Sequence, residues 1–320
     1  MMSDTGKPRL IILTGPTSVG KTGLSIRLAS GLSGEIISAD SMQVYRHMDI
    51  GTAKITKEQM RGIPHHLIDI LEPTEEYNVA RFKEEAQKAV SEISKRGKLP
   101  IIAGGTGFYI QALLYDIDFS DNAQTDYRRK LFDAAAEYGN EYLFEKLKEV
   151  DPKAASYLHA NDVKRVTRAL EFYKETGMRI SEHNDNERKK EPIYDHAYFV
   201  LNMPREQLYN NIDRRVDDMI ENGLVDEVRR LKDMGCTEDM VSMKGLGYKE
   251  ILRFLSGDIS LDEAVYTIKR DTRHFAKRQL TWFKRERDVI WINKDEFDND
   301  DERIAEFIKE HLIKTGVYKE

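Results

Sequence analysis

The stretch that most constrains the fold of this chain is GPTSVGKT, Gly15 to Thr22. An apolar run, LIIL, precedes it, and an amphipathic stretch, GLSIRLASGL, follows it. A strand, a glycine loop and a helix in this order direct backbone N–H groups and the positive end of the helix at a phosphate. In such a loop Gly15 and Gly20 allow the turn, Lys21 supplies a charge and the Thr22 hydroxyl can hold Mg²⁺. The pattern predicts a site for a diphosphate-like group without saying which molecule carries it; the alternative is a glycine turn that merely begins a helix.

The N-terminal part of the chain alternates strand and helix patterns. Residues 9–15, 34–40 and 98–105 read as strands, and 20–32 and 78–97 as helices, with Asn78 as an N-cap and Gly97 just past the end. Strands separated by helices predict a parallel sheet with crossover connections. Ligands of such sheets bind at the carboxyl ends of the strands, so the loops after these strands are the expected site.

The pattern then changes to consecutive helices over residues 126–177. The polar stretch Ser181 to Pro192 reads as an exposed linker or mobile loop, residues 196–203 as a strand, and 288–293 as a late strand before the last helix. We therefore predict an α/β fold, a P-loop NTPase-like parallel sheet core with an all-helical insertion domain. The core with its C-terminal helices would comprise residues 1–119 and 193–320, and the insertion residues 120–192.

Composition narrows the class of protein. The chain has 320 residues, of which 33% are charged, a net charge of −6 and one cysteine, Cys236, which excludes an internal disulfide and any cysteine-based zinc site. The apolar run before the glycine loop is too short for a signal peptide or a membrane span. We expect a cytoplasmic protein without membrane contact, and a monomer because no long apolar helix face is left unassigned.

The charge is unevenly distributed. From Lys269 to Arg287 there are three Lys and five Arg against Asp271 and Glu286, a local excess of 8 − 2 = +6. Aromatic residues, Trp282 among them, interrupt this run, as phosphate contacts plus base stacking would require. The alternative is a solvated helix face that pairs with acidic neighbours. A shorter basic stretch is KRVTR, Lys164 to Arg168.

Three further features are ambiguous on their own. Asp40 ends the second strand and can be a magnesium ligand, a general base, or a turn or helix cap. The glycines of GGTGFY, Gly104 to Tyr109, allow close approach of a ligand or simply a tight turn, with Thr106 as a helix N-cap. Arg214 and Arg215 can offer a fork to an oxyanion, although pairing with Asp213 or Asp217 is the simpler interpretation.

Eight ordered segments together resemble one family, the tRNA dimethylallyltransferases, over nearly the whole length. They are GPTSVGKT, SADSMQVYRHMDIGTAK, PHHLID, GGTGFYIQALL, NDVKRVTRALE, DRRVDDMIENGLVDEV, GLGYKEI and AKRQLTWFKR. The resemblance implies that the glycine loop holds the diphosphate of dimethylallyl diphosphate. The dimethylallyl group would be transferred to the exocyclic amine of the adenosine immediately 3′ of the anticodon in tRNA, with release of diphosphate.

The resemblance also implies roles for individual residues. Asp40 would be the base that takes the amine proton, and Thr17, Lys21 and Arg215 would stabilise the leaving diphosphate together with Mg²⁺ held near Thr22. The implied diphosphate loop comprises Gly15, Pro16, Thr17, Ser18, Val19, Gly20, Lys21 and Thr22. The implied tRNA contacts are Asp40, Ser41, Met42, Gln43, Thr106, Arg128, Lys164, Arg165, Arg168, Lys277, Arg278, Gln279 and Trp282.

Two departures from the family pattern accompany the match. His47 stands where many relatives have glycine, which leaves the local backbone in question. Some eukaryotic members carry a C-terminal zinc finger, which a chain with one cysteine cannot form.

Two other functions fit parts of the sequence. This loop is commoner in small-molecule and nucleotide kinases, but a kinase would have no use for the basic and aromatic run from Lys269 to Arg287. A non-catalytic RNA-binding protein would not need Lys21, Thr22 and Asp40 together. The sequence does not predict which tRNAs would be substrates.

Overall fold

The computed structural model describes residues 6–119 and 126–318. These residues form two compact units, one within Met1–Asp116 and Ile193–Glu320 and the other within Ile117–Pro192. The domain boundary predicted at residue 120 lies outside the described residues. Each unit has its own core and is described by itself.

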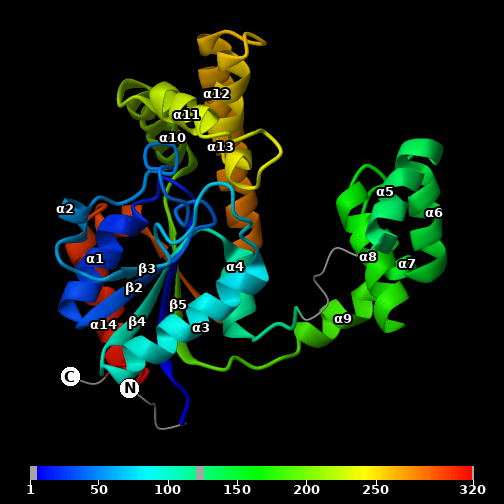
Figure 1. Ribbon diagram of the computed structural model, residues 1–320. Coiled ribbons are helices and arrows are strands. Elements are labelled where there is room, and N and C mark those ends of the chain that lie inside the picture. Colours follow the sequence, from blue (N-terminus) through cyan, green and yellow to red (C-terminus); the bar gives the residue numbers. More distant parts are fainter. Residues whose placement is uncertain (1–5, 120–125, 319–320) are drawn as a thin grey trace. The chain divides into compact units, whose positions relative to one another are not determined.

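The first unit is built on a parallel six-stranded sheet with strand order β3-β2-β4-β1-β5-β6. Figure 1 shows the strands between layers of helices. The predicted α/β fold with a parallel sheet is confirmed. The strands are β1 (Arg9–Thr14), β2 (Gly34–Ala39), β3 (His65–His66), β4 (Leu99–Gly104), β5 (Asp195–Asn202) and β6 (Val289–Asn293).

Strand β1 lies in the middle of the sheet and is buried along its whole length. Ile12 pairs with Ile102 of β4 on one side and with Tyr198 of β5 on the other. Strands of parallel sheets are covered on both faces, which explains why β1 reads as a continuous apolar run. The loop that follows β1 is therefore attached to a fully buried strand in the middle of the sheet.

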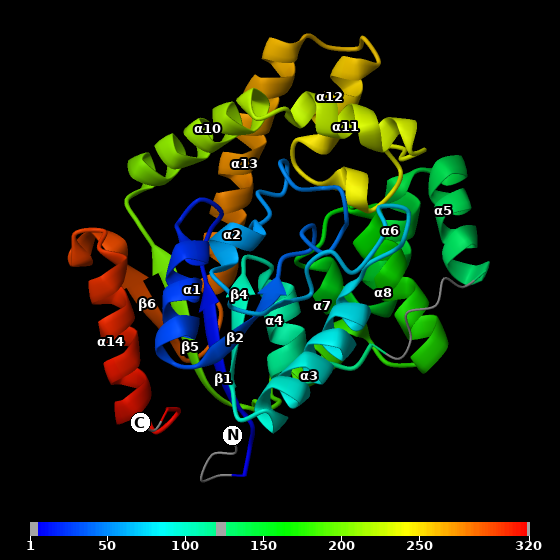
Figure 2. The same ribbon diagram turned by 60° about the vertical axis from the view of Figure 1, so that its left-hand side comes forward.

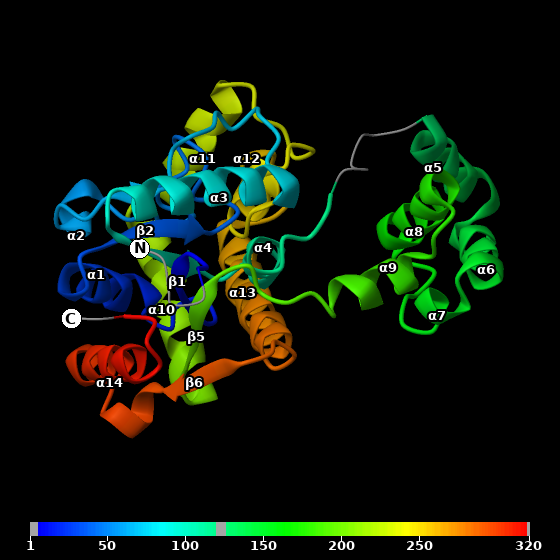
Figure 3. The same ribbon diagram turned by 90° about the horizontal axis from the view of Figure 1, so that it is seen from below.

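Helices cover both faces of this sheet (Figures 1 and 3). On one face α1 (Lys21–Gly31) and α14 (Asp301–Lys314) bury Leu28 and Ile308 against Ile11 and Phe199. On the other face lie α3 (Val79–Lys95) and α4 (Gly107–Leu114). The Asn78 side chain accepts the Arg81 N–H at 3.0 Å, so the predicted N-cap of α3 is confirmed.

Four helices gather at the carboxyl end of the sheet (Figures 1 and 2). They are α10 (Arg205–Glu221), α11 (Leu224–Asp233), α12 (Tyr248–Leu255) and α13 (Leu261–Phe283). Three short elements lie in the connections: α2 (Lys57–Met60), η1 (Ser242–Lys244) and η2 (Lys294–Phe297). Helix α2 is absent from the sequence-based predictions, although the capping box of Thr56 and Gln59 that begins it is readable in the sequence.

The second unit consists of helices around a small apolar core. Its helices are α5 (Asp126–Tyr138), α6 (Asn140–Val150), α7 (Pro152–Ala155), α8 (Val163–Thr176) and α9 (Ile180–Glu187). Leu143, Leu147 and Val166 are central in the core. Along the described part of the chain, no helix is long and apolar enough to cross a membrane.

The prediction of a loop from Ser181 to Pro192 is wrong for its first half, because α9 runs to Glu187. The Asp151 carboxylate explains the difference. It accepts both the backbone N–H and the hydroxyl of Ser181, at 2.9 and 2.7 Å, in the first turn of α9. A negative charge at a helix N-terminus stabilises the helix, and here it comes from a residue distant in the sequence.

Candidate active site

The loop after β1 has the backbone of a phosphate cradle. Gly15 and Gly20 have φ values of 146° and 97°, which side chains rarely allow. A Cβ at Gly15 would lie 2.6 Å from the Leu201 carbonyl oxygen, so this glycine also allows the loop to pack against β5. Ser18 has φ 62° without being glycine, and its buried hydroxyl lacks a hydrogen-bond partner within the described residues. An unsatisfied hydroxyl in a loop of N–H donors fits an anionic ligand.

The Lys21 side chain folds back onto this loop. Its ammonium donates to the carbonyl oxygens of Gly15 and Pro16, at 2.9 and 2.7 Å. Burial lowers the pKa of Lys21 to about 7, helped by the charge of Arg215 and opposed by that of Asp40. The free site therefore holds a cation that lacks a carboxylate partner among the residues described and is destabilised by desolvation.

Arg215, on α10, is a second such cation. Its guanidinium is partly buried, and burial lowers its pKa while Asp40 opposes the change. The expected pairing with Asp213 or Asp217 is wrong, because those carboxylates bind Arg273 and Lys269 of α13, at 2.5 and 2.6 Å. Arg215 makes no ion pair within the described parts of the chain and remains available for an anion. Its neighbour Arg214 binds Asn211 instead.

Asp40 lies beside these two cations and holds its own turn. Its Oδ1 accepts the backbone N–H groups of Met42 and Gln43, at 2.9 and 3.3 Å. The turn-capping interpretation is therefore correct for one oxygen. Its Oδ2 has no hydrogen-bond partner among the described residues, which leaves one carboxylate oxygen for chemistry.

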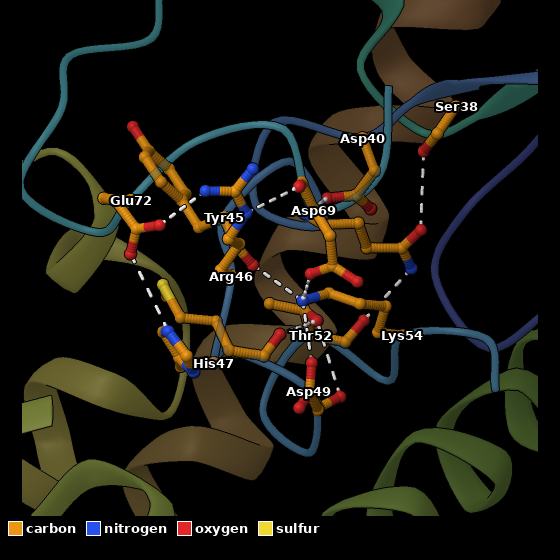
Figure 4. Close-up of polar contacts among 12 residues, drawn as sticks. Ser38, Asp40, Tyr45, Arg46, His47, Asp49, Thr52, Lys54, Asp69 and Glu72 are labelled. Carbon is orange, nitrogen blue, oxygen red and sulfur yellow. Dashed lines mark hydrogen bonds and ion pairs between the residues drawn. The ribbon is translucent and has the colours of Figure 1, made fainter. Parts of the chain in front are cut away.

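The segment after Asp40 is fixed by polar contacts (Figure 4). The Gln43 amide accepts from the Ser38 hydroxyl and donates to the Thr52 carbonyl, at 3.4 and 3.2 Å. Figure 4 shows the Lys54 ammonium between Asp49 and Asp69, to which it binds at 2.8 and 2.6 Å. These contacts fold residues 38–54 back on themselves next to the carboxyl end of β2.

A buried carboxylate that is not among the predicted site residues holds the same segment in place. Glu227 of α11 accepts the N–H groups of Asp49, Ile50 and Gly51, at 2.9, 2.7 and 3.0 Å, and the Tyr248 hydroxyl at 2.7 Å. One signal could have found it: Glu227 occupies a buried position in an otherwise apolar stripe that comprises Leu224, Val228 and Leu231. A charged residue in such a stripe needs buried partners.

His47 lies on the outside of this segment, in the left-handed region, with φ 65°. Glycine adopts this conformation without strain, so the glycine that the family resemblance implies at this position would fit the same backbone. The His47 Nε2 atom lies 3.7 Å from a Glu72 carboxylate oxygen, and Glu72 also binds Arg46 at 2.6 Å. The departure at this position is thus accommodated locally.

The loop after β4 lies beside the loop after β2. Thr106 is the N-cap of α4, as predicted, but its hydroxyl makes no capping hydrogen bond, and its N–H donates to the Ala39 carbonyl at 3.2 Å. Glycine is required here by protein rather than ligand contacts. A Cβ at Gly104 would overlap Ala39, at Gly105 it would overlap the Gln279 amide, and at Gly107 the Trp282 indole.

The basic run on α13 divides into two parts. Lys269 and Arg273 pair with acids of α10, and Arg270 with Asp271, as the surface interpretation predicts. Lys277 and Arg278 are exposed and lack an acidic partner among the described residues. Trp282 lies near Phe108, with Arg285 over its ring at 5.1 Å. The second half of the run therefore offers cations and an aromatic ring together.

The basic residues of the helical unit also divide. Arg128 and Arg168 bind the fully buried Glu171, at 2.6 and 3.3 Å. Lys164 and Arg165 are exposed at the beginning of α8, where Arg165 has a loose ion pair with Asp162 at 3.3 Å. Two of these four residues are thus held in place by a carboxylate, and two face solvent.

The site offers few protein ligands for a metal ion. The described residues contain no cluster of three or more His, Cys, Asp or Glu side chains that could hold a metal ion. The Thr22 hydroxyl is exposed at the beginning of α1 and makes no hydrogen bond within the described chain. A metal here would therefore take most of its ligands from the bound anion and water, as Mg²⁺ does at substrate phosphates.

The lowered pKa of Lys21 predicts proton uptake when diphosphate binds. In the free protein this amine loses its proton near pH 7, and an anion in the loop would restore the charged form, so binding above pH 7 takes up about one proton. Calorimetry in two buffers of different ionisation enthalpy measures the uptake, and K21M measures the ligand's own protonation. Equal proton uptake by wild type and K21M would contradict this assignment.

The lowered pKa of Lys21 also makes the stability of the protein depend on pH. Because the pKa is lower in the folded than in the unfolded protein, the cost of burying the ammonium is present in full below pH 7. It is relieved as the pH rises from about 7 toward 10.5, so this group makes the free energy of unfolding rise over that range.

Comparisons with known proteins agree over nearly the whole chain. The sequence profile of the IPP transferase family matches residues 43–286. The tRNA dimethylallyltransferase of Lachnoclostridium phytofermentans is 58% identical over 301 residues, which cover 94% of this chain and 96% of the relative. That of Acetivibrio thermocellus is 53% identical over 310 residues, which cover 97% and 99%.

Two solved structures are similar in fold as well as in sequence. A full-length tRNA isopentenylpyrophosphate transferase from Bacillus halodurans superimposes with a TM-score of 0.73 at 45% identity, covering 97% of this chain and 98% of that chain. A eukaryotic dimethylallyltransferase, solved in crystallographic snapshots of its action on tRNA, has a TM-score of 0.82 at 32% identity, covering 97% and 81%.

Proposed function

The chain belongs to the IPP transferase family, whose curated relatives are tRNA dimethylallyltransferases, and from this premise we propose its reaction. It transfers the dimethylallyl group of dimethylallyl diphosphate to the exocyclic amine of the adenosine immediately 3′ of the anticodon in tRNA. The observation that carries the proposal is the placement of Lys21 and Arg215, two cations without a carboxylate partner, beside a carboxylate, Asp40, with one free oxygen.

The two cations stabilise the leaving group. When the allylic C–O bond breaks, its electron pair stays on diphosphate, and charges already in place stabilise it without reorganisation. Lys21 lies on the loop and Arg215 close enough to interact with it. The Thr17 and Ser18 hydroxyls, which lack partners among the described residues, are further donors for this anion.

Mg²⁺ fits the site as a companion of the diphosphate. The exposed Thr22 hydroxyl is the protein ligand we propose for it, and the charge of Asp40 lies close enough to influence the neighbouring Lys21. When bound, the ion would neutralise part of the diphosphate charge.

Asp40 is the base that we propose for the nucleophile. The lone pair of the adenine amine is shared with the ring, so the amine must lose a proton as the new N–C bond forms. The Oδ2 atom of Asp40 can accept that proton while Oδ1 keeps the turn closed. Atoms and charge balance: the amine gains the allyl group, Asp40 gains the proton and diphosphate leaves with the electron pair.

The adenosine must leave its stack in the anticodon loop to reach this site, at a cost of a few kcal/mol. We propose that RNA contacts of two kinds offset this cost. In the first unit they are the 40–43 segment, Thr106, and the exposed cations of α13 with Trp282. In the helical unit they are Lys164 and Arg165, with Arg128 and Arg168 aligned by Glu171.

A transfer assay tests the proposal. Radiolabelled dimethylallyl diphosphate, Mg²⁺ and an unmodified anticodon stem-loop with adenosine in this position are expected to give labelled RNA. A matched stem-loop with guanosine there is expected to stay unlabelled. The relatives named above are tRNA prenyltransferases, so the kinase alternative has lost its support; unlabelled RNA together with transfer of the ATP γ-phosphate to a small acceptor would restore it.

A further inference from the structure

Gln279 of α13 connects two loops at the carboxyl end of the sheet. Its Oε1 atom accepts the backbone N–H of Thr17, in the loop after β1, at 2.9 Å. Its Nε2 atom donates to the carbonyl oxygen of Gly105, in the loop after β4, at 2.8 Å. The residue is 6% exposed, and both ends of its amide have hydrogen-bond partners inside the protein.

The fit around this amide is close. A Cβ at Gly105 would overlap the Gln279 Nε2 atom, and a Cβ at Gly107 would overlap the Trp282 indole, one helical turn further along α13. The two glycines therefore let α13 approach the loop after β4. They do not leave room for a ligand at that point.

Gln279 and its neighbours lie on different sides of α13. Lys277 and Arg278 are exposed, whereas Gln279 and Ala276 are buried. Successive residues of a helix point in directions about 100° apart, so one helix can present cations outward and a buried amide to the diphosphate loop. The resemblance to the family groups these residues as RNA contacts, but their surroundings differ.

We propose that Gln279 is a positioning residue for the diphosphate loop and makes no contact with RNA. Thr17 directly precedes Ser18, whose left-handed backbone is strained for a residue with a side chain. Such strain persists only where surrounding contacts impose it. The bond from Thr17 to Gln279 is such a contact, and it sets the loop before the ligand arrives. The assignment of the ligand rests on the proposed function.

The test measures diphosphate binding and RNA binding independently of each other. Q279M keeps the length of the side chain and removes both hydrogen bonds. We expect the Kd of inorganic diphosphate and the KM for dimethylallyl diphosphate to rise about tenfold, the effect of losing one ordinary hydrogen bond. The Kd of the anticodon stem-loop and kcat at saturating substrates are expected to stay within about threefold of wild type. A variant that is only destabilised would not raise the diphosphate Kd and the KM while leaving the stem-loop Kd and kcat nearly unchanged.

R278Q is the matched control on the same helix. It removes an exposed cation beside the buried amide, so it is expected to weaken stem-loop binding and to leave the Kd of diphosphate unchanged. If Q279M does not fold, Q279L also removes both hydrogen bonds without adding a charge, and it is expected to weaken diphosphate binding in the same direction.

Weaker stem-loop binding by Q279M with an unchanged diphosphate Kd would overturn the proposal and make Gln279 an RNA contact. Failure of the proposed function is a different result. In that case wild type would bind diphosphate but label no RNA, and the effect of Q279M on diphosphate binding would still decide the role of Gln279.

Discussion

Replacement of Asp40 with Asn is expected to lower the rate of prenyl transfer about 10²–10⁴-fold, the usual contribution of a positioned general base. The amide cannot take the proton that the adenine amine must lose. Its Oδ1 atom can still accept the Met42 and Gln43 N–H groups, so the turn remains closed. Single-turnover transfer at saturating substrates measures the loss, and the stem-loop Kd is expected to stay at the wild-type value.

D40A is the matched comparison. It removes the base and also the two bonds that close the turn, so it should weaken stem-loop binding in addition to abolishing transfer. If D40N retained more than about a tenth of the wild-type rate, the base would have to be another group.

Replacement of Lys21 with Met is expected to lower kcat about 10²–10³-fold, the typical loss when one preorganised donor to a developing charge is removed. The ammonium lies against the loop carbonyls of Gly15 and Pro16, in the loop that we propose holds the diphosphate. Because the variant also removes a buried charge, its thermal midpoint should not fall below that of wild type. Rapid-quench transfer and a thermal melt test both parts.

K88M is the control for this substitution. Lys88 is exposed on α3 and has no ion pair within the described residues. The same loss of charge there is expected to leave transfer unchanged. A K21M enzyme with a wild-type rate would assign the stabilisation of diphosphate to Arg215 and Mg²⁺ alone.

Local patterns predicted much of the fold and the centre of the site. The apolar run before GPTSVGKT becomes the central strand, and the Asn78 cap begins α3 as predicted. Both predictions were correct because the groups that interact are neighbours in the sequence. The loop predicted from Ser181 failed for the opposite reason, since the carboxylate that stabilises α9 comes from Asp151.

Long-range contacts account for what the sequence did not predict. The partners that take Asp213 and Asp217 away from Arg215 lie on α13, 60 and 52 residues further along the chain. The Glu227 contacts to residues 49–51 and the Gln279 contact to Thr17 are of the same kind. A pattern within a short window cannot say which distant side chain completes a site.

The bond between Thr17 and Gln279 also has a consequence for the synthesis of the protein. The two residues are 262 positions apart, and a ribosome delivers the N-terminal one first. Until β5 has emerged, β1 has an open edge where Ile12 will pair with Tyr198, and such edges invite pairing with other chains. The loop after β1 is among the first segments to be made, but it acquires its bond to Gln279 only after α13 has been synthesised.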